Sequence, residues 1–209
     1  DPRQSAPAMK PGRLATATIA ALWLAGHALS LTRFPPMHAD EGWLAAETRS
    51  ILVARSAAAT ADFFHLTPRS AHAIRLLFHA LQAPFVAMSW SLASVRLLSL
   101  LCGLGVILLA AELAARLFRS AGARLLLVGG LALDPLLCAS SHLARPEVVL
   151  VLALMAALLI RARRPLPGLA TEALVGSVIG LAIGVHANSL LVALAVGALY
   201  ALDALRALR

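Results

Sequence analysis

The sequence predicts an all-α fold, a polytopic membrane helix bundle of about six transmembrane helices with interfacial helices in the first external loop. Three observations predict this fold class: of 209 residues, 60% are hydrophobic, only 13% are charged, and the apolar residues form long runs. Soluble domains are nearer half apolar and a quarter charged. Because few polar positions interrupt the runs, no water-facing stripe is left for a soluble bundle. The helices are therefore expected to face lipid.

Six segments are apolar and long enough for a helix that crosses the hydrocarbon core, which needs about 20 residues. They are residues 14–33, 94–117, 122–141, 146–162, 169–185 and 187–205. Only residues 142–145 separate the third segment from the fourth, and the last two meet at His186. Both of these turns are therefore expected to be tight.

The Lys and Arg residues that flank these segments alternate as the positive-inside rule requires of cytoplasmic ends. Eleven of the 18 basic residues fall in four clusters on one side, whereas the short opposite turns hold only Arg145. The clusters are Arg3, Lys10 and Arg13; Arg116, Arg119 and Arg124; Arg161, Arg163 and Arg164; and Arg206 and Arg209. Both termini are therefore expected to be cytoplasmic, with residues 1–13 as a tail, residues 14–209 as the membrane domain and the loop 34–93 facing outward.

The net charge of +8 does not indicate a nucleic-acid-binding protein. Such proteins gather their basic residues on one soluble face, whereas here the basic residues lie between apolar runs. The two cysteines, Cys102 and Cys138, fall inside apolar runs and have no paired or metal-ligand spacing. They are expected to be packing residues.

Two interfacial helices are expected in the loop 34–93. In the first, apolar residues from Trp43 to Leu52 recur at roughly helical spacing, which predicts a helix at the membrane surface. The second covers residues 74–90, an apolar stretch that polar residues and a proline interrupt. A seventh span there would invert the charge pattern that follows, so this helix is predicted to be interfacial or partly re-entrant.

An acidic pair, Asp40 and Glu41, follows the first span, after Pro35 and Pro36, which hold the chain extended. One interpretation makes Asp40 the N-cap of the surface helix and Glu41 a first-turn residue that the helix dipole favours. The other makes Asp40 a general base, because a carboxylate at the edge of the low-dielectric phase can take a proton from an attacking hydroxyl or amine. The two interpretations are compatible.

Two further polar turns share the predicted outer side. In the first, Arg145 and Glu147 flank Pro146, which is typical of an ordinary polar turn at a helix start. Alternatively, Arg145 binds an anionic head group, since guanidinium geometry suits phosphate. His186 lies in the other turn with Asn188, where a lone histidine is usually only an interfacial residue. The convergence of three polar turns on one side favours a site there.

Glu112 and Asp134 lie within predicted spans, where an ionisable group is costly. Glu112 is near the cytoplasmic end of its segment. Asp134 precedes Pro135, and its carboxylate is expected to satisfy backbone donors at a helix break. The sequence has no Walker loop, paired-cysteine metal motif or nucleophile elbow.

Four short motifs follow one another along the chain. They are His38-Ala39-Asp40-Glu41, Arg96-Leu97-Leu98-Ser99, the run from Asp134-Pro135 to Ala144-Arg145-Pro146-Glu147, and Gly180-Leu181-Ala182-Ile183-Gly184-Val185-His186. In this order and sidedness they resemble the GT-C membrane glycosyltransferases that use polyprenyl-phosphate sugars, including aminoarabinose transferases of lipid A and protein O-mannosyltransferases. The chain departs from the family pattern at Leu98, where proline is usual, and at Glu147, where aspartate is common.

The resemblance implies an enzyme that transfers a sugar, with inversion, from a polyprenyl-phosphate donor to a lipid, glycan or protein acceptor on the outer face of the membrane. It implies that Asp40 and Glu41 are catalytic. It also implies four residues that bind the donor phosphate or the acceptor: Arg96, Arg145, Glu147 and His186. Some GT-C enzymes use a divalent cation and others do not, so the metal requirement stays open. The implied location is the plasma (inner) membrane of a bacterium, with the lipid bilayer and not nucleic acid as partner.

Family members are usually much longer, so the chain is expected to be an N-terminal portion or a reduced relative, and activity of this portion alone is in question. Two other classes stay open. A transporter module would place ionisable residues near the midplane on broken helices, for which Asp134-Pro135 is the candidate. A non-catalytic assembly subunit would use its packed spans to hold a partner and would tolerate neutralisation of Asp40 and Glu147.

Overall fold

The structure is a computed structural model that describes residues 11–61, 69–70, 76–163 and 168–208. Most of these residues are helical, and two short strands pair antiparallel. The elements are α1 (Pro11–Ser30), α2 (Ala39–Ala54), β1 (Thr60–Ala61), β2 (Arg69–Ser70), α3 (Leu76–Met88), α4 (Leu92–Leu117), α5 (Ala121–Ala132), α6 (Pro135–His142), α7 (Glu147–Arg163), α8 (Leu169–Val185) and α9 (Ser189–Ala207).

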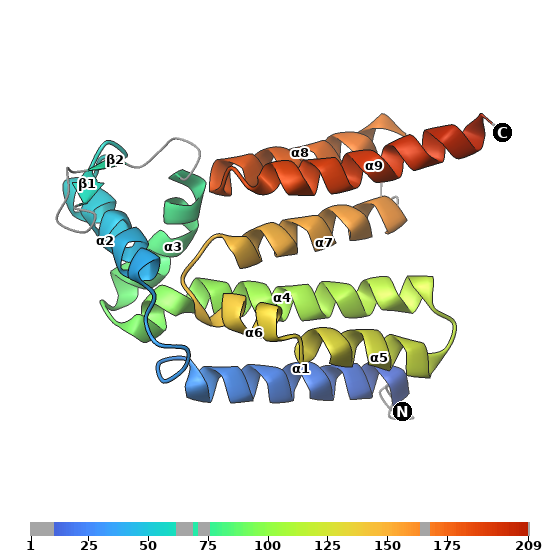
Figure 1. Ribbon diagram of the computed structural model, residues 1–209, viewed down its shortest axis with the longest axis horizontal. Helices are drawn as coiled ribbons and strands as arrows, with labels where there is room; N and C mark the ends of the chain where they lie inside the picture. The colour runs from blue at the N-terminus through green and yellow to red at the C-terminus, as the bar shows by residue number, and fades with distance from the viewer. Residues whose placement is uncertain (1–10, 62–68, 71–75, 164–167, 209) are drawn as a thin grey trace, which may run out of the picture.

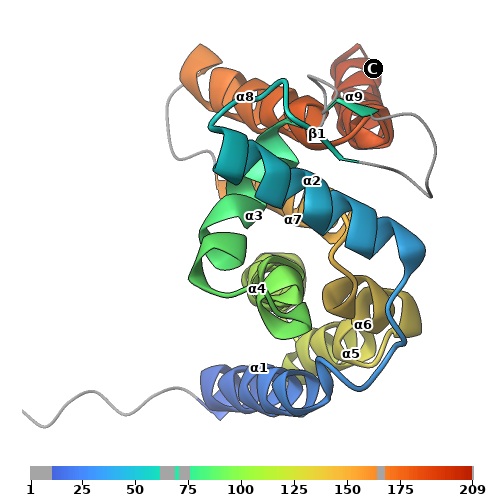
Figure 2. The same cartoon turned by 90° about the vertical axis from the view of Figure 1, so that its left-hand side faces the viewer.

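The long helices run side by side, and α2, α3 and the strand pair gather at one end of them (Figure 1). At the opposite end, α1 begins and α9 ends. Viewed from the first end, α2 lies across the bundle, with α1 and α5 to one side of it and α8 and α9 to the other (Figure 2). The two ends of the bundle are therefore unlike: one is covered by the segment between α1 and α4, and the other is formed by helix ends and by the short turn between α4 and α5.

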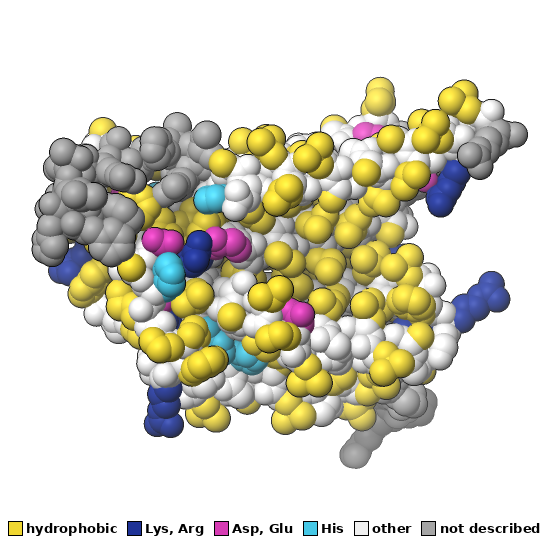
Figure 3. Space-filling view, in the orientation of Figure 1, with side chains coloured by type: hydrophobic (Ala, Val, Ile, Leu, Met, Phe, Trp, Pro, Cys, Tyr) yellow, Lys and Arg dark blue, Asp and Glu magenta, His cyan; other side chains and the backbone are white. Residues whose placement is uncertain are grey.

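Two helices among the described residues, α4 and α9, are long and apolar enough to cross a bilayer. A third span results if α5 and α6 are taken together as one bent span, whereas Leu14–Ser30, α3 and α8 are apolar but shorter. Hydrophobic side chains cover the middle of the face shown in Figure 3, and charged side chains gather toward its ends. The predicted membrane helix bundle is therefore confirmed in its helical character, and length and composition support two or three spans.

The predicted segment 122–141 is not one helix. It divides into α5 and α6, which are bent by 49° at the break between them. Pro135 begins α6, and a proline disfavours helical backbone in the residue before it. Asp134 caps the second helix, since its Oδ1 accepts a hydrogen bond of 2.7 Å from the Leu137 N–H. The expectation that Asp134 satisfies backbone donors at a helix break is confirmed.

Helix α4 lies at the centre of the bundle and packs against α1, α5, α6 and α7. Val106 and Ile107, in its middle, are fully buried. It approaches α6 and α1 closely at Gly103, where an added Cβ would lie 2.7 Å from the Ser141 Cβ and 2.8 Å from the Trp23 Cη2. Small residues let helix backbones approach closely, which matters in membranes because lipid is as apolar as the side chains.

The other predicted segments are confirmed as helices to within a few residues, and both predicted tight turns are present. The two helices expected in the external loop are α2 and α3, although parts of the loop, residues 62–68 and 71–75, lie outside the described residues. Most of the predicted tail 1–13 also lies outside them.

At the end of the bundle where α4 and α7 finish, ion pairs connect the helices. The Glu112 Oε1 lies 2.6 Å from the Arg163 Nη2 and 3.0 Å from the Arg116 Nη2. Glu112, which was predicted near the cytoplasmic end of its span, is half-exposed and paired with two cations at the helix ends.

Candidate functional site

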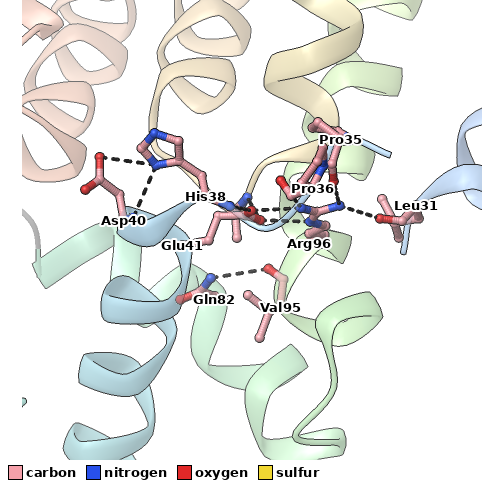
Figure 4. A network of polar contacts seen from close by, with 10 residues as sticks. Leu31, Pro35, Pro36, His38, Asp40, Glu41, Gln82, Val95 and Arg96 are labelled. Carbon is pink, nitrogen blue, oxygen red and sulfur yellow. Dashed lines mark hydrogen bonds and ion pairs between the residues drawn. The ribbon is translucent and has the colours of Figure 1, made fainter. Parts of the chain in front are cut away.

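A fully buried ion pair joins Glu41, in the first turn of α2, to Arg96, in the first turns of α4. The Arg96 Nε donates to the Glu41 Oε1 and the Arg96 Nη2 donates to the Glu41 Oε2, both at 2.8 Å. This bidentate geometry matches the planar guanidinium fork to the carboxylate. Figure 4 shows the two side chains facing one another, with the extended segment after α1 beside them.

The remaining donors of Arg96 fix the segment that connects α1 to α2. The Arg96 Nη1 donates to the carbonyl oxygens of Leu31 at 2.8 Å and Pro35 at 3.0 Å, and the Nη2 also donates to the Pro36 carbonyl at 3.4 Å. All five N–H groups of this guanidinium are thereby used within the protein. The structure leaves no donor of Arg96 for a ligand.

The Glu41 carboxylate also accepts two backbone hydrogen bonds. The Ala144 N–H donates to its Oε1 at 2.8 Å and the His38 N–H donates to its Oε2 at 2.9 Å. Burial by itself would raise the pKa of Glu41, but the hydrogen bonds from Arg96, Ala144 and His38 and the charge of Arg96 outweigh it. The pKa of this carboxyl therefore lies below its usual value, and the group is ionised at neutral pH.

The lowered pKa of Glu41 makes stability depend on pH in the acid range. The contribution of the ionised carboxylate is fully present above the unfolded value near 4.5 and is lost as the pH falls through the lower folded pKa. We expect the difference in thermal midpoint between wild type and Glu41→Gln, in detergent, to be constant above about pH 5 and to shrink at lower pH. A difference that stays constant down to about pH 3 would contradict this assignment.

Beside this buried pair lie three charged side chains that reach the surface. The Arg145 Nη2 lies 2.7 Å from the Glu147 Oε1 and 3.7 Å from the Asp40 Oδ2. Each of these side chains retains about a third of its exposure, from 33% for Arg145 to 38% for Asp40. Figure 3 shows acidic, basic and histidine side chains gathered at this end of the bundle. The structure thus brings together three of the residues that the sequence selected.

The buried carboxylate sets the geometry of the exposed cluster, because its partners are sequence neighbours of the cluster residues. Asp40 immediately precedes Glu41, and Arg145 immediately follows Ala144, whose N–H bonds to Glu41. The backbones that carry Asp40 and Arg145 are therefore held near one another through one side chain, although the two residues lie on segments far apart in the sequence. Such support from buried hydrogen bonds gives a surface site defined geometry.

The prediction that Asp40 is the N-cap of the surface helix is wrong. His38 occupies the N-cap position, and its Nδ1 accepts a hydrogen bond of 3.2 Å from the Asp40 N–H. The carboxylate of Glu41 closes the capping box by accepting from the His38 N–H. With capping provided by these two side chains, the carboxylate of Asp40 is left to the surface, where its Oδ2 lies 3.7 Å from the His38 Nδ1.

His186 lies at the same end of the bundle, at the turn between α8 and α9. It is the C-cap residue of α8, and its Nδ1 accepts a hydrogen bond of 3.0 Å from the Asn188 N–H. The structure therefore places the predicted residues in three groups: the exposed cluster of Asp40, Arg145 and Glu147; the buried pair; and His186 at a neighbouring turn.

A buried polar cluster behind α2 was not predicted. The Thr48 Oγ1 lies 2.8 Å from the His79 Nδ1 and donates to the Gln82 Oε1 at 2.6 Å, and the Gln82 Nε2 donates to the Val95 carbonyl at 3.3 Å. The only sign of this cluster in the sequence is that His79 and Gln82 interrupt an apolar stretch. The cluster connects α2 and α3 to the start of α4, beside the buried ion pair.

A second unpredicted contact lies between α1 and the end of α6. The Nδ1 atoms of His27 and His142 are 3.3 Å apart, and the His142 Nε2 lies 3.2 Å from the Ser30 Oγ. His27 and Ser30 also line an apolar groove of about 510 Å³ between α1 and α5. The two histidines lie 115 residues apart and nothing in the sequence relates them, so their pairing could be seen only in three dimensions.

No three His, Cys, Asp or Glu side chains come together as a metal site anywhere in the described part of the chain. The exposed cluster has two carboxylates, but a guanidinium lies between them. Searches of protein-family models, curated proteins and solved structures found no match to this chain.

Proposed function

We propose that the chain is the membrane portion of a glycosyltransferase that moves a sugar, with inversion, from a polyprenyl-phosphate donor to a lipid, glycan or protein acceptor. In this proposal six segments span a bacterial plasma membrane, both termini are cytoplasmic, and α2 and α3 lie on the outer face. The basic residues in the last turns of α4, α7 and α9 support this orientation, since these helix ends lie opposite to α2.

The observation that carries the proposal is the juxtaposition of Asp40 and Arg145 on a rigid, buried support at the end of an apolar bundle. A carboxylate can accept a proton from an attacking group, and a guanidinium can offset the charge of a departing phosphate. In an inverting transfer the attacking and leaving groups lie on opposite faces of the anomeric carbon, so the Asp40 Oδ2, which lies 3.7 Å from the Arg145 Nη2, has to turn away from Arg145 when the donor binds. Holding the backbones of both residues in place provides the positioning on which such a transfer depends.

In the proposed reaction an acceptor hydroxyl or amine attacks the anomeric carbon of the donor sugar. Asp40 takes the proton of the acceptor as the new bond to carbon forms. The bond from that carbon to the phosphate oxygen breaks, and its electron pair leaves with the phosphate, whose charge Arg145 stabilises. Glu147 orients Arg145, and His186 is assigned to the binding of acceptor or donor. No step of this scheme runs through a metal ion.

The contacts of Glu41 and Arg96 favour a different role for these two residues from the one that the resemblance implies. Both are fully buried and hydrogen-bonded within the protein, so neither offers a free polar atom to a substrate. We therefore assign them as positioning residues that hold Asp40 and Arg145 in place, and we assign phosphate stabilisation to Arg145 alone.

Asp40→Asn is expected to lower the rate of sugar transfer by roughly 100-fold, as is typical for loss of a general base. The assay uses the full-length protein in right-side-out vesicles, in which the proposed site faces the medium, and a panel of radiolabelled polyprenyl-phosphate sugars. Asn keeps the shape of the side chain, so expression and the thermal midpoint should not change.

The matched control is Glu172→Gln, which also removes one exposed carboxylate but lies in the first turn of α8, at the other end of the bundle. It should leave transfer unchanged. If Asp40→Asn retained most of the activity at normal expression, Asp40 would not be the base.

A further inference from the structure

Only one nitrogen of the Arg145 guanidinium contacts carboxylates. Its Nη2 contacts the Glu147 Oε1 at 2.7 Å and the Asp40 Oδ2 at 3.7 Å. Within the described residues, its Nε and Nη1 make no hydrogen bond to the protein. Arg145 therefore presents an unused edge to the surface, in contrast to Arg96, whose N–H groups are all bonded.

In the observed arrangement the charges around Arg145 do not favour the binding of an anion. Two carboxylates share one guanidinium, so the three side chains carry a net charge of −1 when all are ionised. A phosphate that approaches the free edge of Arg145 is attracted by one cation and repelled by two anions, all within a Debye length. An anion can therefore bind well only if a carboxylate moves away from Arg145.

The two carboxylates hold Arg145 unequally. The Glu147 oxygen is 1 Å closer to the Nη2 than the Asp40 oxygen is, at 2.7 against 3.7 Å. Glu147 is also close to Arg145 along the chain, at the start of α7, whereas Asp40 belongs to α2. An anion that competes for the guanidinium will displace the longer contact first, while Glu147 continues to orient the side chain.

We propose that Asp40 and Glu147 are resident counter-ions of Arg145 and that a phosphate group must displace Asp40 from it in order to bind. Donor binding then frees the Asp40 Oδ2 to accept a hydrogen bond from the acceptor, so the donor binds before the acceptor. This order rests on the proposed function, because it assigns the donor phosphate to Arg145.

The test titrates inorganic phosphate against the purified chain in neutral detergent at low salt and follows binding by the ³¹P line width. Asp40→Asn removes the carboxylate that phosphate has to displace, and Glu147→Gln removes the other competing anion; each is expected to tighten phosphate binding about threefold. Arg145→Gln is expected to weaken it by at least about tenfold, because charge-assisted hydrogen bonds are lost. The double variant Arg145→Gln/Glu147→Gln should bind phosphate as weakly as Arg145→Gln does. This result would show that the tighter binding of Glu147→Gln depends on Arg145.

Glu172→Gln is the control for a general change in net charge and should bind phosphate as the wild type does. The proposal is overturned if Asp40→Asn or Glu147→Gln leaves phosphate binding unchanged or weakens it, or if the double variant keeps the gain. If the variants bind phosphate as expected but the protein transfers no sugar, only the proposed function is refuted. Sugar transfer without any effect of Glu147→Gln on phosphate binding would refute the counter-ion proposal alone.

Discussion

Replacing Glu41 with Gln is expected to lower the free energy of unfolding by about 3 to 5 kcal/mol. The substitution keeps the size of the side chain but leaves the Arg96 guanidinium charged and fully buried without its counter-ion. An uncompensated buried charge costs far more than the loss of a surface pair. The measurement is thermal or denaturant unfolding of the purified chain in detergent, with the wild type in parallel.

Two further variants separate this effect from a general loss of charge. Glu112→Gln removes a half-exposed carboxylate that also contacts arginines, and it should cost no more than about 1 kcal/mol. Glu41→Leu/Arg96→Met replaces both partners by apolar groups and should recover part of the stability lost in Glu41→Gln. A cost for Glu41→Gln as small as that for Glu112→Gln would show that the buried pair does not hold the segments together.

Replacing Gly103 with Val is expected to destabilise the bundle by about 3 kcal/mol or more. The first added carbon would lie 2.7 Å from the Ser141 Cβ and 2.8 Å from the Trp23 Cη2. The Ser141 Oγ, which lies closer still, donates to the Leu137 carbonyl at 2.6 Å and cannot turn away without losing this bond. α4 would therefore have to move away from α6 and α1.

Gly176 in α8 provides the matched control, because nothing lies within 4 Å of a Cβ added there. Gly176→Val should change the free energy of unfolding by less than about 1 kcal/mol, since only helix propensity is altered. Thermal midpoints of both variants in the same detergent check the pair. Equal effects at the two glycines would mean that the close approach at Gly103 is not tight in solution.

The helices could be predicted from the sequence because long apolar runs and basic flanks leave few alternatives. The break at Asp134 was visible in the Asp-Pro pair, but hydropathy alone joined α5 to α6 because both halves are equally apolar. Capping of α2 was assigned to Asp40 because aspartate is a commoner cap than histidine. The assignment failed because the helix begins at Ala39, directly after His38, where Glu41 accepts a hydrogen bond from the His38 N–H. The position of Glu41 depends on contacts with the rest of the bundle, which the local sequence does not show.

The site could be predicted only as a set of residues on one side of the membrane. The sequence does not distinguish an exposed charge from a buried one, and for this reason Glu41 and Arg96 were grouped with Asp40 and Arg145. Their partnership spans 55 residues, and the contact of Glu41 with Ala144 spans 103. Contacts between residues so far apart in the sequence leave no periodic or local pattern from which a single sequence could predict them.

These separations also bear on how the protein is made. At synthesis rates of about 5 to 20 residues per second, Ala144 emerges roughly 5 to 20 s after Glu41, which lies 103 residues earlier. During that interval the Glu41 carboxylate lacks its bond from Ala144, and for the first part of it also lacks Arg96. The contacts of Glu41 are therefore completed only after α6 has been synthesised, and a nascent chain that stops before α6 holds Asp40 without Arg145 beside it.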